Sequence, residues 1–295
     1  MSFSKCHTTC RPFAGARSLF FGWAIFLLTP LSALAQGDPM DVLLGQLRQD
    51  GFSRQQIASL TTLGTPPLYQ TVSRTLQIRE SQLNYNQFLE PSRLNKAEQF
   101  LRDHEETLIR AEKCFAVDRT VIVAILLVET HLGQYTGKTP TLAVLSTFAL
   151  MDQESARDTV WELLSEKDRA RWGREAFDTR LLKRSRWAYA ELCSLLRWSE
   201  SQRDRPEAYY GSVMGAVGWA QFLPSSMIHY GADGNGDGRI DLFRPEDAIF
   251  SVANYFRGHG WPQAADRQAR EAVVHRYNKS EPYVYTVLEI ASRIQ

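Results

Sequence analysis

The order of apolar and polar positions along the chain predicts a mainly helical protein. In most segments apolar residues recur every three or four positions, and few segments alternate with the period of two that is typical of strands. We therefore expect at most a small sheet or ribbon, somewhere in residues 130–245. The clearest helical patterns are two short helices in 41–60 separated by Gly51, one long amphipathic helix in 92–115, a charged helical region in 154–205, a helix that starts at Pro245, and a last helix in 283–294.

The most apolar stretch runs from Val121 to Val128 without a polar residue, and Glu129 follows it directly. Asp118 suits the N-cap of a helix here, and Gly133 suits the position after its C-terminus. A helix that is apolar on all sides belongs to a core. Glu129 is therefore expected to be held in a fixed position at the end of a buried helix.

A carboxyl at this place is either paired with a cation, such as Lys138 or an arginine, or lies at the lip of a cleft, because burying it alone is costly. Apolar neighbours and the negative end of its own helix both raise the pKa of Glu129. A carboxyl that stays protonated near neutral pH suits a general acid. The helix alone leaves both interpretations open.

The first 35 residues predict a cleavable export signal. Lys5, Arg11 and Arg17 precede an apolar run that ends in Ala33-Leu34-Ala35. A retained membrane anchor is the alternative, although the apolar run is short for a span. No Cys follows the run, which argues against lipid attachment, and export places the protein in the periplasm.

The net charge bears on the kind of partner, and the cysteine content bears on disulfide bonds. The signal carries three positive charges and no acid, so its removal changes the formal net charge from +1 to −2. A near-neutral body argues against nucleic acid as a partner. Cys114 and Cys193 remain after cleavage, and their spacing fits either a disulfide or two free thiols.

Residues 233–247 resemble an EF-hand loop of unusual length. Asp233, Asn235 and Asp237 occupy its first, third and fifth positions, and the carbonyl of Arg239 falls at the seventh. The twelfth position should be Glu but is Arg244. Hard oxygen ligands suit calcium, and the alternative is a polar turn without an ion.

Several ordered motifs resemble those of the lytic murein transglycosylase B type, glycoside hydrolase family 103. The resemblance spans about residues 85–290 and rests on V-E-T-x-x-G, then G-K-T, then G-S-x-x-G-A-x-G-x-x-Q-F-x-P-S-S. These motifs match Glu129-Thr130, Gly137-Lys138-Thr139, Gly211-Ser212, Gly215-Ala216, Gly218, Gln221-Phe222 and Pro224-Ser225-Ser226. Taken without the resemblance, the glycines fit either close approach to a ligand or tight packing of a helix.

The resemblance implies a lysozyme-like α+β catalytic core in a mainly α chain. The expected divisions are the signal 1–35 and a catalytic domain 36–295, with a helical N-terminal part 36–112, the core 113–262 and a C-terminal helical closure 263–295. Residues 151–190 are longer than the corresponding segment of the family, and three roles are open: a changed preference for strand ends, a partner surface, or only a solvated helix.

The family also implies roles for individual residues. Glu129 is the expected catalytic residue. The expected sugar-binding residues are Ser212, Gln221, Tyr255, Asn278, Tyr283 and, as a weaker match, Tyr85. Without the resemblance, Tyr255 fits core packing beside Phe256 equally well. Asp247 takes the place of the missing closing ligand, so the calcium ligands become Asp233, Asn235, Asp237, Arg239 and Asp247.

The implied activity is cleavage of the bond between N-acetylmuramic acid and N-acetylglucosamine in peptidoglycan strands. One glutamate acts first as acid and then as base, a 1,6-anhydro ring closes, and no organic cofactor is needed. Two alternatives stay open at this point: a muramidase of the lysozyme kind that uses water, and a peptidoglycan-binding protein without activity.

Overall fold

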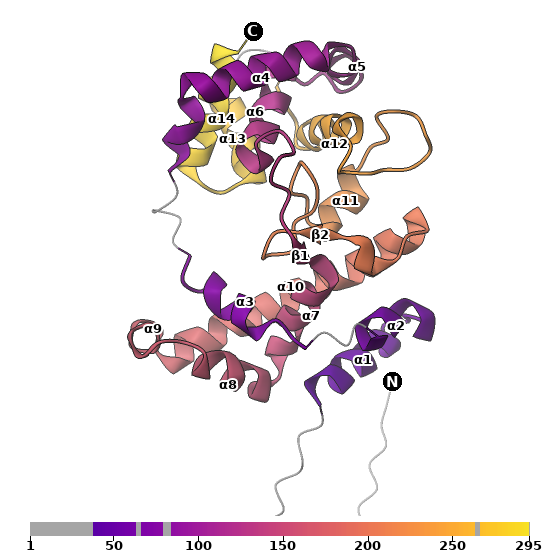
Figure 1. Ribbon diagram of the computed structural model, residues 1–295, viewed down its shortest axis with the longest axis vertical. Coiled ribbons are helices and arrows are strands. Elements are labelled where there is room, and N and C mark those ends of the chain that lie inside the picture. Colours follow the sequence, from indigo (N-terminus) through magenta and orange to yellow (C-terminus); the bar gives the residue numbers. More distant parts are fainter. Residues whose placement is uncertain (1–37, 63–65, 79–83, 263–265, 295) are drawn as a thin grey trace, which may run out of the picture. The chain divides into compact units, whose positions relative to one another are not determined.

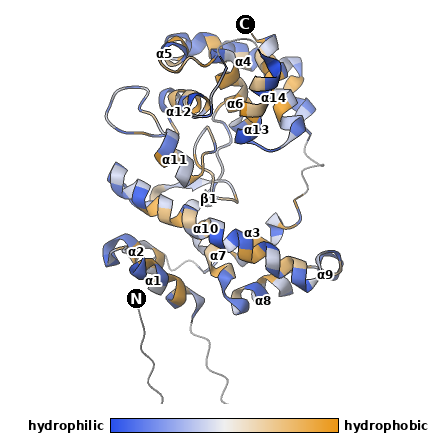
Figure 2. Cartoon of the chain, turned by 180° about the vertical axis from the view of Figure 1, so that it is seen from behind, coloured by the Kyte–Doolittle hydropathy of each residue, from blue (hydrophilic) through white to orange (hydrophobic). Residues whose placement is uncertain are grey.

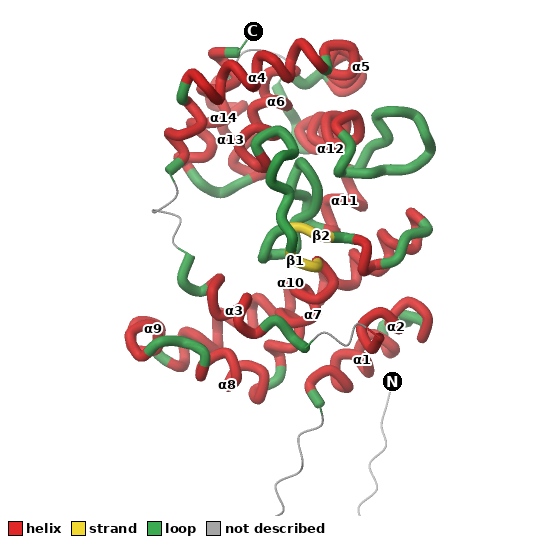
Figure 3. Tube along the Cα trace, viewed as in Figure 1, coloured by secondary structure: helices red, strands yellow, loops and turns green. Residues whose placement is uncertain are grey.

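The structure is a computed structural model that describes residues 38–62, 66–78, 84–262 and 266–294. Within these ranges it contains fourteen α-helices, short 3-10 turns and a two-stranded ribbon, as predicted (Figures 1 and 3). The predicted signal lies outside the described residues. No helix in the described part of the chain combines the length and apolar character needed to cross a bilayer.

The predicted core helix is α6, Arg119–Thr130. All eight residues from Val121 to Val128 are buried, and the helix is apolar over most of its surface (Figure 2). Burial of each aliphatic side chain stabilises the fold by about 1.5–3 kcal/mol. The helices around α6 are α4 (Pro91–Asp103), α5 (Glu105–Phe115), α12 (Pro245–Gly258) and α14 (Glu281–Arg293), and α13 (Arg267–Tyr277) packs on α14.

A second group of helices surrounds α10, Arg174–Gln202, the longest in the described residues. It packs most extensively against α7, Thr141–Ala149. The rest of this group comprises α1 (Pro39–Gln49), α2 (Arg54–Thr62), α3 (Tyr69–Thr75), η3 (Leu150–Asp152), α8 (Glu154–Glu162), α9 (Glu166–Trp172) and η4 (Pro206–Ala208). Helix α11, Pro224–Tyr230, contacts both α10 and α12 and so links the two groups.

The ribbon lies between these groups (Figure 1). Strands β1 (Thr139–Pro140) and β2 (Tyr210–Gly211) pair antiparallel, and two further bridges join Gly211 to Val217 and Val217 to Phe222. Gly137 precedes β1 with φ +89°, and a Cβ added there would stand 2.1 Å from the Gly211 carbonyl oxygen. Only glycine permits this approach.

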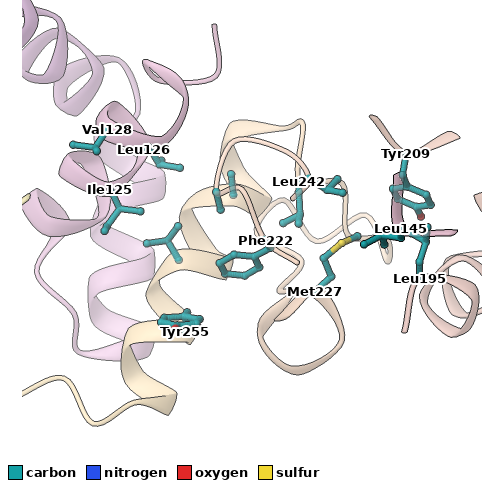
Figure 4. Packing of buried hydrophobic residues seen from close by; sticks show 14 of the residues in the cluster. Ile125, Leu126, Val128, Leu145, Leu195, Tyr209, Phe222, Met227, Leu242 and Tyr255 are labelled. Carbon is teal, nitrogen blue, oxygen red and sulfur yellow. The ribbon is translucent and has the colours of Figure 1, made fainter. Parts of the chain in front are cut away.

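The buried apolar residues form one continuous cluster that passes through the ribbon. Figure 4 shows Ile125 and Leu126 of α6 on one side, Phe222 and Leu242 in the middle, and Leu195 of α10 on the other. The end of α6 and the ribbon are therefore fixed against each other by packing.

Two predicted helix boundaries were wrong. The single helix expected in 92–115 is two, because His104 leaves helical geometry with φ −117° and ψ 23° and its ring packs on Phe100 at 4.2 Å. The helix expected to run up to Gly133 ends at Thr130, and His131 is its left-handed cap residue. Asp118 does stand at the N-cap, but its carboxylate accepts hydrogen bonds from Trp261 and Arg270 instead of capping α6.

Two other open questions are settled by the fold. Cys114 is exposed on α5 and Cys193 is buried on α10, and both are free thiols. The long segment 151–190 is not simply a solvated helix, because it packs against α3. Arg171 donates to the Leu76 carbonyl at 3.0 Å, and Arg184 donates to Thr75 Oγ1 at 2.9 Å.

Candidate active site

Glu129 lies one residue before the end of α6 and lines a pocket of about 250 Å³. The other walls come from η2 (Tyr85–Leu89) with the residue before it, from Asn278 in the segment that joins α13 to α14, and from Tyr283 in the first turn of α14. The lining residues are Asn84, Tyr85, Gln87, Phe88, Val128, Glu129, Asn278 and Tyr283, and Glu129 carries the only carboxyl among them. We call this space the Glu129 pocket.

The carboxylate of Glu129 accepts a hydrogen bond from the Tyr283 hydroxyl at 2.6 Å. Tyr283 is itself buried, stacks on Tyr277 with ring centroids 6.5 Å apart, and meets Tyr85 edge-on at 5.9 Å. Tyr277 in turn donates its hydroxyl proton to the carbonyl of Ala220. Packed aromatic rings thus fix the position of the phenol that touches the acid.

The pKa of Glu129 is raised to about 7, chiefly because burial disfavours its charged form. The Tyr283 hydrogen bond acts in the opposite direction, since it stabilises the carboxylate. Among the described residues no ion pair involves Glu129, and Lys138 is exposed. The ion-pair interpretation of Glu129 is therefore not supported, and the carboxyl can both give and take a proton near neutral pH.

The residues after Glu129 explain part of the V-E-T-x-x-G motif. Thr130 Oγ1 donates to the Trp219 carbonyl at 2.9 Å and accepts from the Gly133 amide at 3.0 Å. A Cβ added to Gly133 would stand 2.1 Å from the Trp219 ring. The end of α6 is therefore tied to the glycine-rich segment that follows β2.

The Glu129 pocket brings together four predicted residues, Glu129, Tyr85, Asn278 and Tyr283. The other three do not line it. Tyr255 is buried, stacks on His259 at 4.1 Å, and donates its hydroxyl proton to the Arg276 carbonyl at 2.9 Å, as expected of a core residue.

Ser212 and Gln221 stabilise backbone turns. Ser212 Oγ accepts from the amides of Met214 at 3.2 Å and Ala216 at 3.1 Å. Gln221 has a left-handed backbone with φ 47°, and its side-chain amide donates to the Thr136 carbonyl at 3.1 Å. In the same motif, Ser225 donates from its amide and its hydroxyl to the buried carboxylate of Glu191.

Sequence reasoning missed Gln87 and Phe88, which line the pocket beside Tyr85. It also missed Tyr277, although this residue links Tyr283 to the ribbon. The one local signal was the cluster of amide and aromatic residues in Asn84–Phe88, which is unusual for a short connection.

The loop 233–247 has an ordered internal hydrogen-bond pattern. Asp233 accepts from the amides of Gly236 at 2.6 Å and Gly238 at 2.8 Å. Asp247 is fully buried and accepts from the amides of Gly234 at 2.8 Å and Asp241 at 2.7 Å, which fixes the loop on α12. The loop thus has the predicted turns and oxygen donors.

Its carboxylates are not gathered around one point. In the described residues no three acidic, histidine or cysteine side chains are arranged to hold a metal ion. The expected ligand set includes only three carboxylates, and its other members are the Asn235 amide oxygen and the Arg239 carbonyl. The donor chemistry therefore fits calcium, which takes carboxylate, amide and carbonyl oxygens as ligands.

Comparison with known proteins finds similarity to transglycosylases. The family model of the transglycosylase SLT domain matches residues 39–271. The membrane-bound lytic murein transglycosylase B of Escherichia coli (strain K12) is 33% identical over 174 residues, which are 59% of this chain and 40% of that protein. The match thus spans less than half of the length of this curated relative.

Solved structures show the same fold. The soluble lytic transglycosylase SltB1 from Pseudomonas aeruginosa has a TM-score of 0.67 at 22% identity, over 86% of this chain and 97% of that one. The Escherichia coli lytic transglycosylase Slt35, solved in complex with calcium, has a TM-score of 0.67 at 23% identity, over 88% of this chain and 93% of that one. These likenesses confirm the expected mainly helical, lysozyme-like fold, and the match over 39–271 shows that the chain belongs to the transglycosylase SLT domain family.

Proposed function

We propose that the chain is a lytic transglycosylase that cleaves the β-1,4 bond between N-acetylmuramic acid and N-acetylglucosamine in peptidoglycan and leaves a 1,6-anhydro end. The observation that carries the proposal is the single carboxyl in the Glu129 pocket, with its pKa raised to about 7. The family and the name of the curated murein transglycosylase support the same substrate.

The reaction needs one group that donates a proton and later takes one back. Protonated Glu129 gives its proton to the glycosidic oxygen as the bond from that oxygen to C1 of the muramoyl residue breaks. The acetamido oxygen of the substrate stabilises the positive centre at C1. Ionised Glu129 then removes the proton of the 6-hydroxyl while O6 bonds to C1, which closes the anhydro ring and restores the acid.

The pocket suits this sequence better than a two-carboxylate mechanism. Most glycosidases place a second Asp or Glu about 5–9.5 Å from the first, as nucleophile or base. No second carboxyl occurs among the described residues that line the Glu129 pocket. Asn278 and Tyr85 lie where they can contact the sugar, and Tyr283 orients the acid.

The test is mass analysis of the products from purified sacculi. A transglycosylase yields anhydro-muropeptides, whereas a muramidase yields products heavier by one water with reducing ends. Anhydro products support the proposal, and reducing ends contradict it. Binding to sacculi without any soluble product would instead favour a binding protein.

Replacing Tyr283 with Phe is expected to move the alkaline limb of the activity profile to higher pH. The hydroxyl stabilises ionised Glu129, so its loss raises the pKa of Glu129 above about 7, by about one unit. Initial rates on sacculi across pH 5–9 measure the midpoint. Tyr285→Phe, an exposed tyrosine of the same helix, is the control. A midpoint that stays or falls contradicts the proposed role of Tyr283.

We further propose that the loop 233–247 takes up calcium. Support comes from the order of its oxygen donors, from buried Asp247, and from the calcium complex of Slt35. A bound ion would stabilise α12 and leave the chemistry to Glu129. A hundredfold excess over Kd corresponds to about 2.7 kcal/mol of stabilisation. We therefore expect millimolar calcium to raise the Tm of the protein by about 5 °C relative to chelator.

The control is Asp247→Asn, which keeps the shape of the side chain and is expected to lose the calcium response. Magnesium at the same concentration should give a smaller shift, because it keeps more of its water ligands. An unchanged Tm with calcium would contradict the proposed calcium site.

We also propose that the protein is secreted into the periplasm after cleavage at Ala35, and N-terminal sequencing of the mature protein tests this.

A further inference from the structure

The segment after α6 carries an aromatic side chain in an exposed place. Tyr135 is 68% exposed, more than any other large apolar or aromatic side chain in the part of the chain that the structure describes. It lies six residues after Glu129, in the loop that leads from α6 to β1 (Figure 3). A tyrosine that is mostly exposed needs an explanation, because most of its ring gains nothing from packing there.

The backbone around Tyr135 is held firmly. His131 and Leu132 are left-handed with φ 52° and 59°, a conformation that persists in non-glycine residues only when the surroundings enforce it. The Tyr135 amide donates to the Thr130 carbonyl at 3.0 Å. On the far side, Gln221 donates to the Thr136 carbonyl. Tyr135 therefore stands on a fixed support between two anchored neighbours.

A row of rings connects Tyr135 to the Glu129 pocket. Its ring meets His131 edge-on at 5.3 Å, and His131 packs on Phe88 at 5.1 Å. Phe88 lines the pocket together with Glu129. Burial, Arg93 and Lys96 lower the pKa of His131, so this middle ring is neutral at pH 7. The row leads from the acid to the surface without a charged member.

We propose that Tyr135 is a binding residue on which a saccharide ring of the glycan strand stacks, next to the bond that Glu129 cleaves. The inference rests on the function proposed above. Sugar rings present apolar C–H faces that suit an aromatic surface, and a tyrosine fixed by its backbone loses little freedom when it binds. Tyr135 falls between the V-E-T-x-x-G and G-K-T motifs on which the resemblance rests.

The experiment compares Tyr135→Ala and Tyr135→Trp with the wild type on glycan strands whose peptide stems have been removed. Stacking of one ring is expected to raise KM about fivefold in Tyr135→Ala, with kcat within about twofold. Tyr135→Trp is expected to keep the wild-type KM. Tyr285→Ala is the control, because Tyr285 is an exposed tyrosine on a different element, α14. This variant should keep the wild-type KM and kcat.

The outcomes separate a stacking role from a structural one. Unchanged KM in Tyr135→Ala overturns the proposal, and so does a fall in kcat together with a lower Tm. An effect that appears only on strands with intact stems also overturns it, because the ring would then contact peptide.

A binding measurement keeps the inference testable if the chain has no turnover. In the Glu129→Gln background, co-sedimentation with stem-free strands should be about fivefold weaker after Tyr135→Ala and restored by Tyr135→Trp. Absence of turnover in the wild type would contradict the proposed function. The co-sedimentation result would then still test the stacking role of Tyr135 independently. Equal binding by all three proteins would contradict the stacking role alone.

Discussion

Replacing Glu129 with Gln is expected to lower turnover of sacculi by at least about a thousandfold, because one side chain performs both proton transfers. The amide keeps the size of the side chain but cannot give a proton to the glycosidic oxygen or take one from the 6-hydroxyl. Release of soluble anhydro-muropeptides measures the loss. Glu106→Gln, on the exposed surface of α5, is the matched control and should keep full activity.

The same variant is expected to be more stable than the wild type at alkaline pH. The pKa of Glu129 is about 7 in the folded protein and 4.5 in the unfolded chain. Between these two pH values the folded protein therefore holds a proton that the unfolded chain releases. This contribution is complete below pH 4.5 and is lost as pH rises through 7.

The pKa shift of Glu129 corresponds to about 3 kcal/mol in the free energy of unfolding, which the wild type loses at alkaline pH. A glutamine side chain does not ionise, so Glu129→Gln keeps this stability. The Tm of the variant should therefore exceed that of the wild type by about 5–10 °C at pH 8, and the difference should shrink at pH 4.5. Equal Tm values at both pH values would show that Glu129 is ionised and solvated in the folded protein.

Replacing Gly137 with Ala is expected to destabilise the ribbon and the site together. The added Cβ would meet the Gly211 carbonyl oxygen at 2.1 Å, and neither backbone can move without breaking the pairing of β1 with β2. We expect a loss of about 4 kcal/mol in the free energy of unfolding and a fall in activity, because the segment from Thr130 to Thr139 would shift.

Gly51 provides a matched control for this change. It has the same φ of +89°, but nothing lies within 4 Å of a Cβ added there. The free energy of unfolding of Gly51→Ala should therefore fall by only about 1 kcal/mol, which is the cost of a left-handed alanine, and its activity should be unchanged. Denaturant unfolding of both variants measures the difference. Equal losses would mean that the close approach at Gly137 does not hold the ribbon.

The sequence predicted those features that depend on local pattern. The unbroken apolar run made α6 a core helix, and the fold buries all eight residues from Val121 to Val128. Glu129 could be singled out for the same reason, since a carboxyl at the end of such a run must be paired or exposed to a cleft. The small ribbon also followed, from the scarcity of alternating segments.

Features set by tertiary contacts could not be predicted from the chain. At the end of α6, the Thr130 side chain donates to the carbonyl of Trp219, which lies far along the chain. Tyr255 was expected in the cleft because of the family resemblance, but its hydroxyl donates to the Arg276 carbonyl. Local pattern contains no information about these two partners, which lie 89 and 21 residues away along the chain.

Phe88 and Gln87 illustrate the same limit at the site. They come from a short 3-10 turn, and only the packing of that turn on α14 and α6 brings them to the acid.

The proposed mechanism depends on one carboxyl, Glu129, whose pKa is raised to about 7 at the end of a buried helix. Carbon-13 NMR of the glutamate side-chain carboxyls, assigned by comparison with Glu129→Gln, measures its titration directly. We predict a midpoint near pH 7 for Glu129 and a higher one in Tyr283→Phe. A Glu129 midpoint near pH 4.5 would contradict this prediction.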